Sequence, residues 1–478
     1  MKTKTLTFYT LKKIVLHFFI LIPFSYAIGQ IEAEVKYTLK HTSDTNTIKI
    51  LIQFDSISSN TTKMVIPRSA PGTYELTNYI SFVKNVKGYT TSNKVLKGVI
   101  GDGSFFIFDK KDEYLKSISY EVDIKKMETN LLGGYASSKL RKNYLGILGY
   151  SVFGFIEGLE NKPIILEINT LKDWPIFSTL LPSTDRKFGT NKYSIVNYNL
   201  LADAQYLLGN GVTIFKVKDA QIPLFVATYS ETPINIKEIG RRGLLSLNGL
   251  FEYFGYIPMP HYTMCYEFLT PISDRHDYGF NMEHLNSMTA SLDTSQAISN
   301  YDSNAKIGSI VHHMGHSWIP LRSYGKGYRP FEWQTAPLIE TIWLNEGFIW
   351  YSSYYSILDN KNILKLFSKT LENAPSYIQK KSLKELSLLG STQYSMDFRI
   401  GRNLFSRGAL LAHELNMKIL NSTNSQKSFK DALLGLLKWT KINKRPFEYD
   451  EIETILSEAV DVDISDIWNK WQKPLDKE

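Results

Sequence analysis

The feature that most constrains the fold is a change of hydrophobic period near Pro233. From about Ile31 to Val226, short runs such as "TNTIKILIQFD" and "SISYEVDIK" are rich in β-branched and aromatic residues, and turn signals such as "GDG" and "GNG" separate them. After Pro233, apolar residues recur at helical spacing, which predicts helices over 303–317, 336–358, 361–373, 398–420, 426–438 and 449–459. The sequence therefore predicts a multidomain α+β protein, with a β-rich, sandwich-like N-terminal region over 30–230 and a mainly α-helical domain over 231–478.

The first 29 residues have the pattern of a secretory signal peptide. Four lysines and no acidic residue precede or flank the apolar run "IVLHFFILIPFSYA", and small residues follow it. The run is shorter than the roughly 20 apolar residues of a membrane-spanning helix. We therefore expect residues 1–29 to be a signal peptide, the mature protein to be exported to the periplasm or the medium, and no transmembrane segment to remain after cleavage.

The net charge gives little support for nucleic-acid binding. The formal charge is +8, and removing the four lysines of residues 1–29 leaves +4 on the remainder. No block of lysines and arginines stands out in that remainder, so we expect no nucleic-acid partner.

The stretch "VHHMGHSW" has the ligand spacing of a helical zinc site. His312 and His316 are four residues apart, so on a helix their imidazoles project from the same face. A catalytic zinc needs a third protein ligand, which a carboxylate on a later helix can supply. Glu346, in the apolar stretch "ETIWLNEGF", is the candidate, because a carboxylate there is costly to bury unless it is paired or bound to metal. Glu340 is the competitor, and a surface position for Glu346 is the alternative.

Several segments resemble the glycyl aminopeptidase family of gluzincin zinc peptidases. They are "HSW" with the following "GYRPFEWQTAPLIETIWLNEGF", the upstream "MVIPRSAPGTYELTNYISFVKNVKG", "NMEH", and "FSRGALLAHELNMKI". The resemblance implies an N-terminal β-domain, a thermolysin-like catalytic domain, zinc held by His312, His316 and Glu346, and Glu283 binding the substrate's α-amine. Typical members also have a C-terminal PDZ domain, which we expect to be missing because the chain ends at Glu478.

Two positions depart from the family pattern in ways that oppose hydrolysis. His313 stands where such peptidases carry the glutamate that accepts a proton from the attacking water and passes one to the leaving amine. Phe405 stands where the family has a tyrosine whose hydroxyl stabilises the oxyanion, and loss of one such donor costs about 10²–10³ in rate. Phe280 and Asn281 replace a glycine pair, which we expect to narrow the cleft.

Three interpretations follow. The favoured one is a zinc-binding, catalytically impaired aminopeptidase-family protein with a cleft for peptides or protein N-termini. The second is an active zinc aminopeptidase with an atypical base, His313 being the evident candidate. The third is a metal-free interaction scaffold built on a peptidase fold.

Overall fold

The computed structural model describes residues 35–43, 45–57, 61–109, 113–132, 137–297 and 304–475. The predicted signal peptide lies outside these residues. From Ala33 onward the chain forms one unit. Among the helices described, none is long and apolar enough to cross a membrane.

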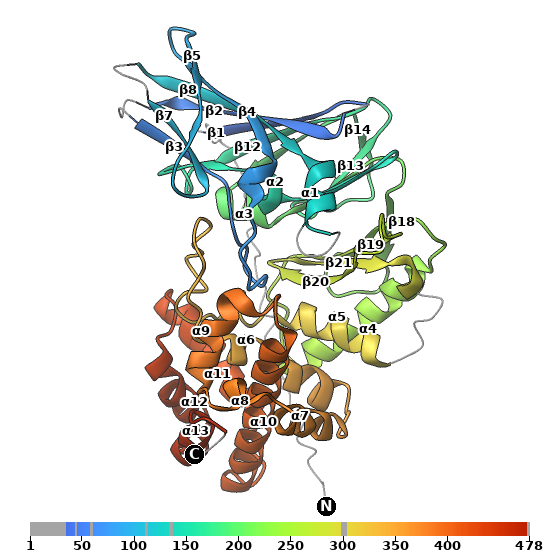
Figure 1. The fold of residues 1–478 in the computed structure, drawn as a ribbon. Helices are drawn as coiled ribbons and strands as arrows, with labels where there is room; N and C mark the ends of the chain where they lie inside the picture. Colours follow the sequence, from blue (N-terminus) through green and yellow to red (C-terminus); the bar gives the residue numbers. More distant parts are fainter. Residues whose placement is uncertain are drawn as a thin grey trace, which may run out of the picture. The chain divides into compact units, whose positions relative to one another are not determined.

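The N-terminal region is built from three sheets (Figure 1). The first has the strand order β15-β12-β1-β2-β8-β4-β5, the second β14-β13-β16-β10-β9 and the third β11-β3-β7-β6. The strands are β1 (Val35–His41), β2 (Thr47–Ile57), β3 (Thr61–Val65), β4 (Val83–Thr90), β5 (Val95–Lys97), β6 (Val99–Ile100), β7 (Phe105–Asp109), β8 (Leu115–Asp123), β9 (Lys139–Arg141), β10 (Tyr144–Leu148), β11 (Phe155–Ile156), β12 (Ile164–Asn169), β13 (Pro175–Ser178), β14 (Lys187–Phe188), β15 (Thr190–Ile195) and β16 (Gln205–Leu208). Short helices connect them: η1 (Tyr79–Phe82), α1 (Ile124–Asn130), α2 (Gly149–Val152) and α3 (Tyr198–Asp203).

Strict alternation gives the first sheet one buried face. In β1, Val35, Tyr37 and Leu39 are buried while the residues between them are more exposed. Antiparallel pairing with β2 sets Tyr37 opposite Ile52 and Leu39 opposite Ile50 on that same face. Period-two patterning of this kind fixes the register, because a slip by one residue would turn every apolar side chain to the solvent. The predicted β-rich region is confirmed.

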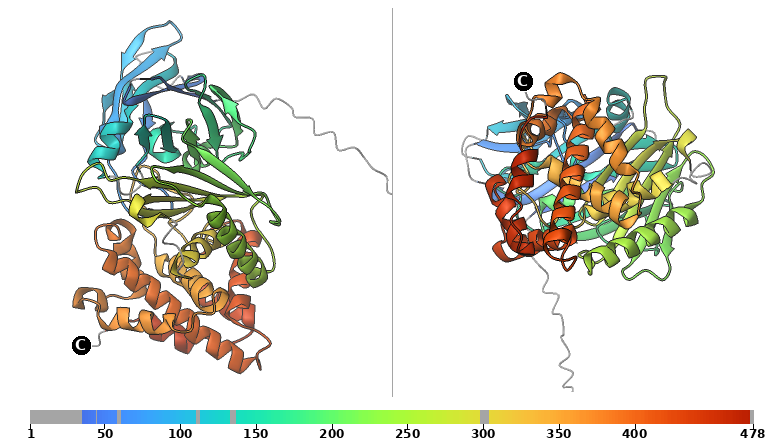
Figure 2. Two further views of the ribbon diagram at one scale, coloured as in Figure 1. Left: turned by 90° about the vertical axis from the view of Figure 1, so that its right-hand side faces the viewer. Right: turned by 90° about the horizontal axis from the view of Figure 1, so that it is seen from below.

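A further sheet, with the order β17-β18-β19-β21-β20, lies between the N-terminal sheets and the helices α4 and α5 (Figures 1 and 2). Its strands are β17 (Thr213–Val217), β18 (Leu224–Ser230), β19 (Tyr262–Leu269), β20 (Gly279–His284) and β21 (Ser287–Asp293). β19 pairs in parallel with β18 and β21, and it is buried along its whole length, as parallel strands covered on both faces are. Because β18 pairs with β19, which lies beyond residue 231, this sheet crosses the predicted domain boundary.

Helices make up the rest of the second region. They are α4 (Ile236–Phe254), η2 (Thr294–Gln296), α5 (Asn304–Gly315), α6 (Ile342–Trp350), the π-helical η4 (Tyr351–Ile357), α7 (Ile363–Glu372), α8 (Ser376–Gln379), α9 (Leu383–Gln393), α10 (Phe398–Ser422), α11 (Phe429–Asn443), η5 (Tyr449–Glu451), α12 (Ile452–Val460) and α13 (Ser465–Trp471). The mixed α+β, multidomain fold class is therefore confirmed.

The predicted helix over 336–358 begins too early, whereas its predicted end is within one residue of the last helical residue, Ile357. α6 begins only at Ile342, because the backbone N–H and C=O of Ile339 hydrogen-bond with the Ser391 hydroxyl of α9 instead of forming a helical turn. From Tyr351 the helix widens into a π-helical segment that ends at Ile357.

Candidate metal centre

Three side chains that are far apart in the sequence converge at the end of α5. His312 lies in the last turn of α5, and His316 follows one residue after its end, with its backbone N–H donating to the His312 carbonyl. Nε2 of His312 and Nε2 of His316 are 3.0 Å apart, and they lie 3.2 Å and 3.3 Å from Oε2 of Glu346. All three residues are buried, and they form a group that could hold a metal ion among the described residues.

The spacing of these atoms fits a tetrahedral zinc. Ligand atoms about 2.0–2.1 Å from a tetrahedral ion lie roughly 3.3 Å from one another. The three separations, 3.0, 3.2 and 3.3 Å, are close to that value. Nδ1 of His316 lies 2.9 Å from the carbonyl oxygen of Ile319, which can only accept, so Nδ1 carries the proton and Nε2 is left as a ligand.

The electrostatics of the cluster favour a cation. Burial and the neighbouring His316 lower the pKa of His312 to about 4. Burial also acts to lower the pKa of His316, but the carboxylates of Glu346 and Glu283 outweigh it and raise that pKa to about 9. Although burial acts to raise the pKa of Glu346, the charge of His316 and the hydrogen bonds of both histidines hold it far below its usual range. A positive charge between these groups is therefore stabilised by the carboxylates around it.

A glycine contact between α6 and α10 brings Glu346 to the site. A Cβ on Gly347 would lie 2.6 Å from Cα of Gly408, and a Cβ on Gly408 would lie 2.0 Å from the Trp343 carbonyl oxygen. The two helices thus approach to backbone contact, as only residues without a side chain allow. Glu346 precedes one of these glycines and Phe405 lies three residues before the other, so the contact places both beside the histidines.

The N-terminal region supplies a hydrogen bond to Glu346. The Tyr74 hydroxyl donates to Oε1 of Glu346 over 2.9 Å, and the Tyr74 side chain is buried. Its backbone has a left-handed φ of 47°, in the "PGTY" turn. Such outer hydrogen bonds orient metal ligands. The sequence analysis did not predict a role for Tyr74. The "PGTY" segment, which resembles the family pattern, is the one sequence feature that pointed to this position.

His313 lies beside the group without joining it. Its Nδ1 lies 2.8 Å from the carbonyl oxygen of Ser309, so Nδ1 is the protonated nitrogen and Nε2 carries the lone pair. Burial, and then the neighbouring His312 and His316, lower the pKa of His313 to about 3. The imidazole is therefore neutral at pH 7.

A cavity of about 270 Å³ adjoins His312, His313 and Glu346. Phe405 is one of its walls, with its ring centroid 6.4 Å from that of His312. Phe280 and Asn281, at the edge strand β20, also line it. Phenylalanine at 405 presents no hydrogen-bond donor to this space.

Glu283 lies behind the cavity wall. A Cβ on Gly72, a lining residue, would be 2.5 Å from Oε1 of Glu283. This oxygen is buried without a hydrogen-bond partner among the described residues, and burial raises the pKa of the carboxyl. An unpaired buried carboxylate oxygen is costly, so a positively charged ligand group would stabilise it.

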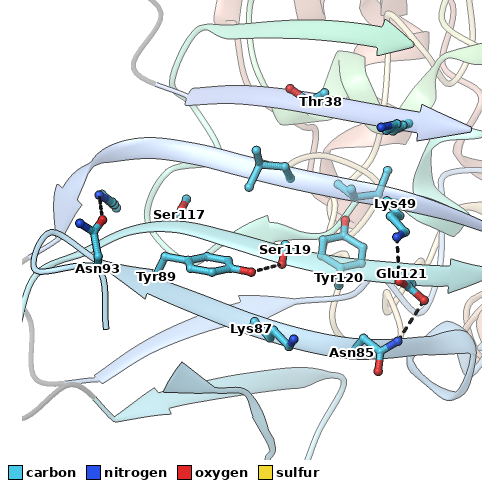
Figure 3. Close-up of a pocket in the computed structure, with 14 residues that line it drawn as sticks. Thr38, Lys49, Asn85, Lys87, Tyr89, Asn93, Ser117, Ser119, Tyr120 and Glu121 are labelled. Carbon is cyan, nitrogen blue, oxygen red and sulfur yellow. Dashed lines mark hydrogen bonds and ion pairs between the residues drawn. The ribbon is translucent and has the colours of Figure 1, made fainter. Parts of the chain in front are cut away.

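A larger hollow of about 810 Å³ lies elsewhere, on the outer face of the seven-stranded sheet (Figure 3). Its lining is polar, with Lys49 and Glu121 paired at 3.6 Å and the hydroxyl groups of Tyr89 and Ser119 3.3 Å apart. The hollow contains none of the three converging residues. We interpret it as the solvated face of the sheet.

Comparison with known proteins shows a peptidase-type N-terminal domain and a fold similar to those of metallopeptidases. Residues 36–210 match the family model of the Peptidase M61 N-terminal domain. The chain is similar in fold to an aminopeptidase N family protein from Idiomarina loihiensis, with a TM-score of 0.77, 16% identity, and coverage of 93% of this chain and 76% of that one. No curated protein sequence matches the chain.

A second similar fold is the M1 zinc metallopeptidase of Deinococcus radiodurans, solved as a point mutant with a bound Tyr-Ser-Ala substrate. The TM-score is 0.56 at 12% identity, covering 93% of this chain and 94% of that one. At these identities the likeness is one of fold. The chain thus has a metallopeptidase-like fold with a peptidase-type N-terminal domain, and its described residues include a group that could hold a metal ion. The narrower resemblance to glycyl aminopeptidases, the absence of a PDZ domain, and the absence of a nucleic-acid partner stay predictions.

Proposed function

We propose that the chain is an exported, zinc-binding protein of aminopeptidase fold that holds peptide N-termini beside the metal and hydrolyses peptides poorly. The observation that carries the proposal is the separation of 3.0–3.3 Å among the ligand atoms of His312, His316 and Glu346, which fits zinc without rearrangement. Zinc held by these three residues would polarise a substrate carbonyl and activate water. In a metal-free scaffold a protonated His316 would have to balance the buried Glu346 carboxylate, a positive charge that zinc would supply instead.

Binding of an N-terminal amine is supported by Glu283. Its buried Oε1 lacks a partner among the residues described, and an ammonium group would provide one. Gly72, which separates it from the cavity, has no side chain to block the approach. Asn281 and Phe280 line the same space, so a bound peptide would run along the edge strand β20.

Weak hydrolysis follows from the two residues that face the metal group. Neutral His313 can accept a proton through Nε2, but it becomes a cation beside Zn²⁺ when it does so, whereas glutamate becomes neutral. Phe405 offers no donor to an oxyanion. Both differences raise the barrier to hydrolysis and leave metal binding intact.

Residual activity with His313 as base is the second candidate. It is favoured by one observation: His313 lines the cavity with Nδ1–H held by Ser309, so that its lone pair is available on Nε2. This candidate differs from the first only in rate.

The test is the zinc content of the mature protein measured by elemental mass spectrometry, together with peptide binding measured by calorimetry. We expect about one zinc per chain, lost in His316→Ala and kept in His413→Ala, a histidine of α10 that lies against the rings of Tyr351 and Tyr355. Free peptides should bind and N-acetylated ones should not, and Glu283→Gln should weaken the free peptides alone. If the wild-type protein binds no zinc after metal loading, the proposed zinc site is contradicted. If acetylated and free peptides bind equally, the proposed binding of the N-terminal amine by Glu283 is contradicted.

A further inference from the structure

One wall of the cavity is a continuous row of aromatic rings. The rings follow the order Tyr354, Trp350, Phe405, Tyr394, Phe398. The distances between the centroids of successive rings are 5.8, 5.0, 5.7 and 5.5 Å. All five residues line the cavity. Each separation lies in the range of aromatic contact.

Two of these rings are seated against glycines. A Cβ on Gly308 of α5 would lie 2.2 Å from the Tyr354 ring, and a Cβ on Gly401 of α10 would lie 1.7 Å from the Tyr394 ring. Each tyrosine thus occupies space that any other residue at the facing position would fill. The π-helical segment that begins at Tyr351 also carries Tyr354. A wall fixed in this way is preorganised for a ligand.

The charges of the lining favour an apolar guest. Glu346 is the one carboxylate among the described lining residues, and it already contacts His312, His316 and the Tyr74 hydroxyl. No lysine or arginine lines the described cavity. Apart from Glu346, a charged side chain that entered would meet no opposite charge among the described lining residues, whereas an apolar one would gain by leaving water.

The wall starts next to the metal group. The centroids of Trp350 and Phe405 lie 6.1 Å and 6.4 Å from that of His312. A residue whose backbone lies at the metal group therefore has the wall within reach of its own side chain. The volume of about 270 Å³ is below the roughly 300–1,000 Å³ of sites for drug-sized ligands, so the cavity encloses one residue and no long segment.

We propose that this aromatic wall is the subsite for the side chain of the peptide's first residue, and that it selects bulky apolar residues, aromatic ones above all. The inference rests on the proposed binding of peptide N-termini and names the class of peptide. Phe405 has a positive role in it, because its ring joins the two halves of the wall.

The experiment compares Phe-Ala-Ala, Leu-Ala-Ala, Ala-Ala-Ala and Lys-Ala-Ala by calorimetry on the zinc-loaded, full-length mature protein. Burial of an aromatic side chain predicts that Phe-Ala-Ala binds roughly 10- to 100-fold more tightly than Ala-Ala-Ala. Lys-Ala-Ala should bind no more tightly than Ala-Ala-Ala. Affinities for Phe-Ala-Ala and Ala-Ala-Ala within about threefold of each other, or equal binding of Lys-Ala-Ala and Phe-Ala-Ala, would overturn the inference.

Variants test whether the wall causes the preference. Phe398→Ala and Tyr394→Ala should lower the ratio of the Phe-Ala-Ala affinity to the Ala-Ala-Ala affinity roughly tenfold while the zinc content stays unchanged. Phe398 is 47% exposed, so its truncation leaves the core intact, and Ile442→Ala, at a 66% exposed position of α11, is the matched control. An unchanged ratio in both wall variants would contradict the subsite.

The same data separate this inference from the proposed function. If the protein contains zinc and binds free but not acetylated peptides, without preference for the first side chain, the proposed function stands and the subsite is refuted. If the protein contains no zinc but still binds Phe-Ala-Ala more tightly than Ala-Ala-Ala, the subsite stands and the proposed zinc binding is refuted. Absence of binding by all four peptides refutes both.

Discussion

The two sides of the cavity differ in how well they match a working zinc peptidase. On the metal side, His312, His316 and Glu346 have the residue types and the separations that zinc requires. On the aromatic side, Phe405 and the nearby His313 line the cavity at the positions where we propose that the oxyanion donor and the acid–base group are missing. Under the proposed function, metal binding and catalysis depend on different residues, so one can be retained while the other is weakened.

The metal side is also the more constrained of the two. Its third ligand is fixed by Tyr74 from the N-terminal region and by the backbone contact of Gly347 with Gly408. The aromatic side includes rings that are partly exposed, such as Phe398. Substitutions on the metal side therefore disturb packing, whereas those on the other side change mainly what the cavity offers to a ligand.

The largest effect is expected from restoring both missing groups. In the double variant His313→Glu with Phe405→Tyr, a general base adds about 10²–10⁴ in rate and an oxyanion donor about 10²–10³. We expect kcat/KM for aminoacyl substrates to rise by at least roughly 10³ over the wild type, with zinc content unchanged. Each single variant should recover part of this gain. A double variant that binds zinc and gains no activity would show that the metal side is also unsuited to catalysis.

Removal of a metal ligand should abolish the stabilisation that zinc gives. A ligand that binds only the folded state at about 1,000 times its Kd stabilises by about 4 kcal/mol. We expect added zinc to raise the Tm of the wild type and to leave that of His316→Ala unchanged. The measurement is thermal unfolding with and without zinc, with His413→Ala as the control. An equal shift in His316→Ala would place the bound zinc elsewhere.

A smaller effect is expected from the hydrogen bond of Tyr74. Tyr74→Phe keeps the ring and removes only the donor to Oε1 of Glu346. Loss of an outer partner typically costs 10–100-fold in metal affinity. Competition with a chelator of known affinity measures the change. An unaltered zinc affinity would mean that the glycine contact alone orients Glu346.

A comparable effect, on folding stability rather than on zinc affinity, should come from the helix contact itself. In Gly347→Ala the new methyl carbon would lie 2.6 Å from Cα of Gly408. Overpacking of this kind typically lowers the free energy of unfolding by 1–3 kcal/mol. Urea unfolding followed by circular dichroism measures it. The matched control is Gly315→Ala on α5, where the added methyl group would meet only side chains. Gly255→Ala is unsuitable as a control, because Gly255 has a φ of 79° that strains any other residue. A stable Gly347→Ala variant would show that α6 can shift without loss.

The sequence predicted the parts of the structure that depend on local spacing. His312 and His316 converge because the helical repeat carries them to one face, and the β1 and β2 strands follow from alternation. α9 was not predicted, although Ser382 and Glu385 form a capping box whose S-x-x-E pattern is visible in the sequence. The start of α6 depends on Ser391, a hydroxyl from another helix, which no local pattern reveals.

The remaining features of the site arise from contacts between distant residues. Tyr74 and Glu346 are 272 residues apart, so neither predicts the other. Tyr394 reaches the cavity because Gly401 leaves room for its ring, a relation that exists only after the helices have packed. Whether His313 and Phe405 act as proposed stays a prediction.

The hydrogen bond from Tyr74 to Glu346 makes the metal site a property of two regions of the chain. Its donor belongs to the segment matched by the peptidase N-terminal domain, and its acceptor belongs to α6. By thermodynamic reciprocity, whatever this bond adds to the affinity for zinc, zinc must add to the association of the two regions. Occupancy of the site and cohesion of the protein are therefore coupled, and a chain that had lost all hydrolysis would still have a reason to keep its ion.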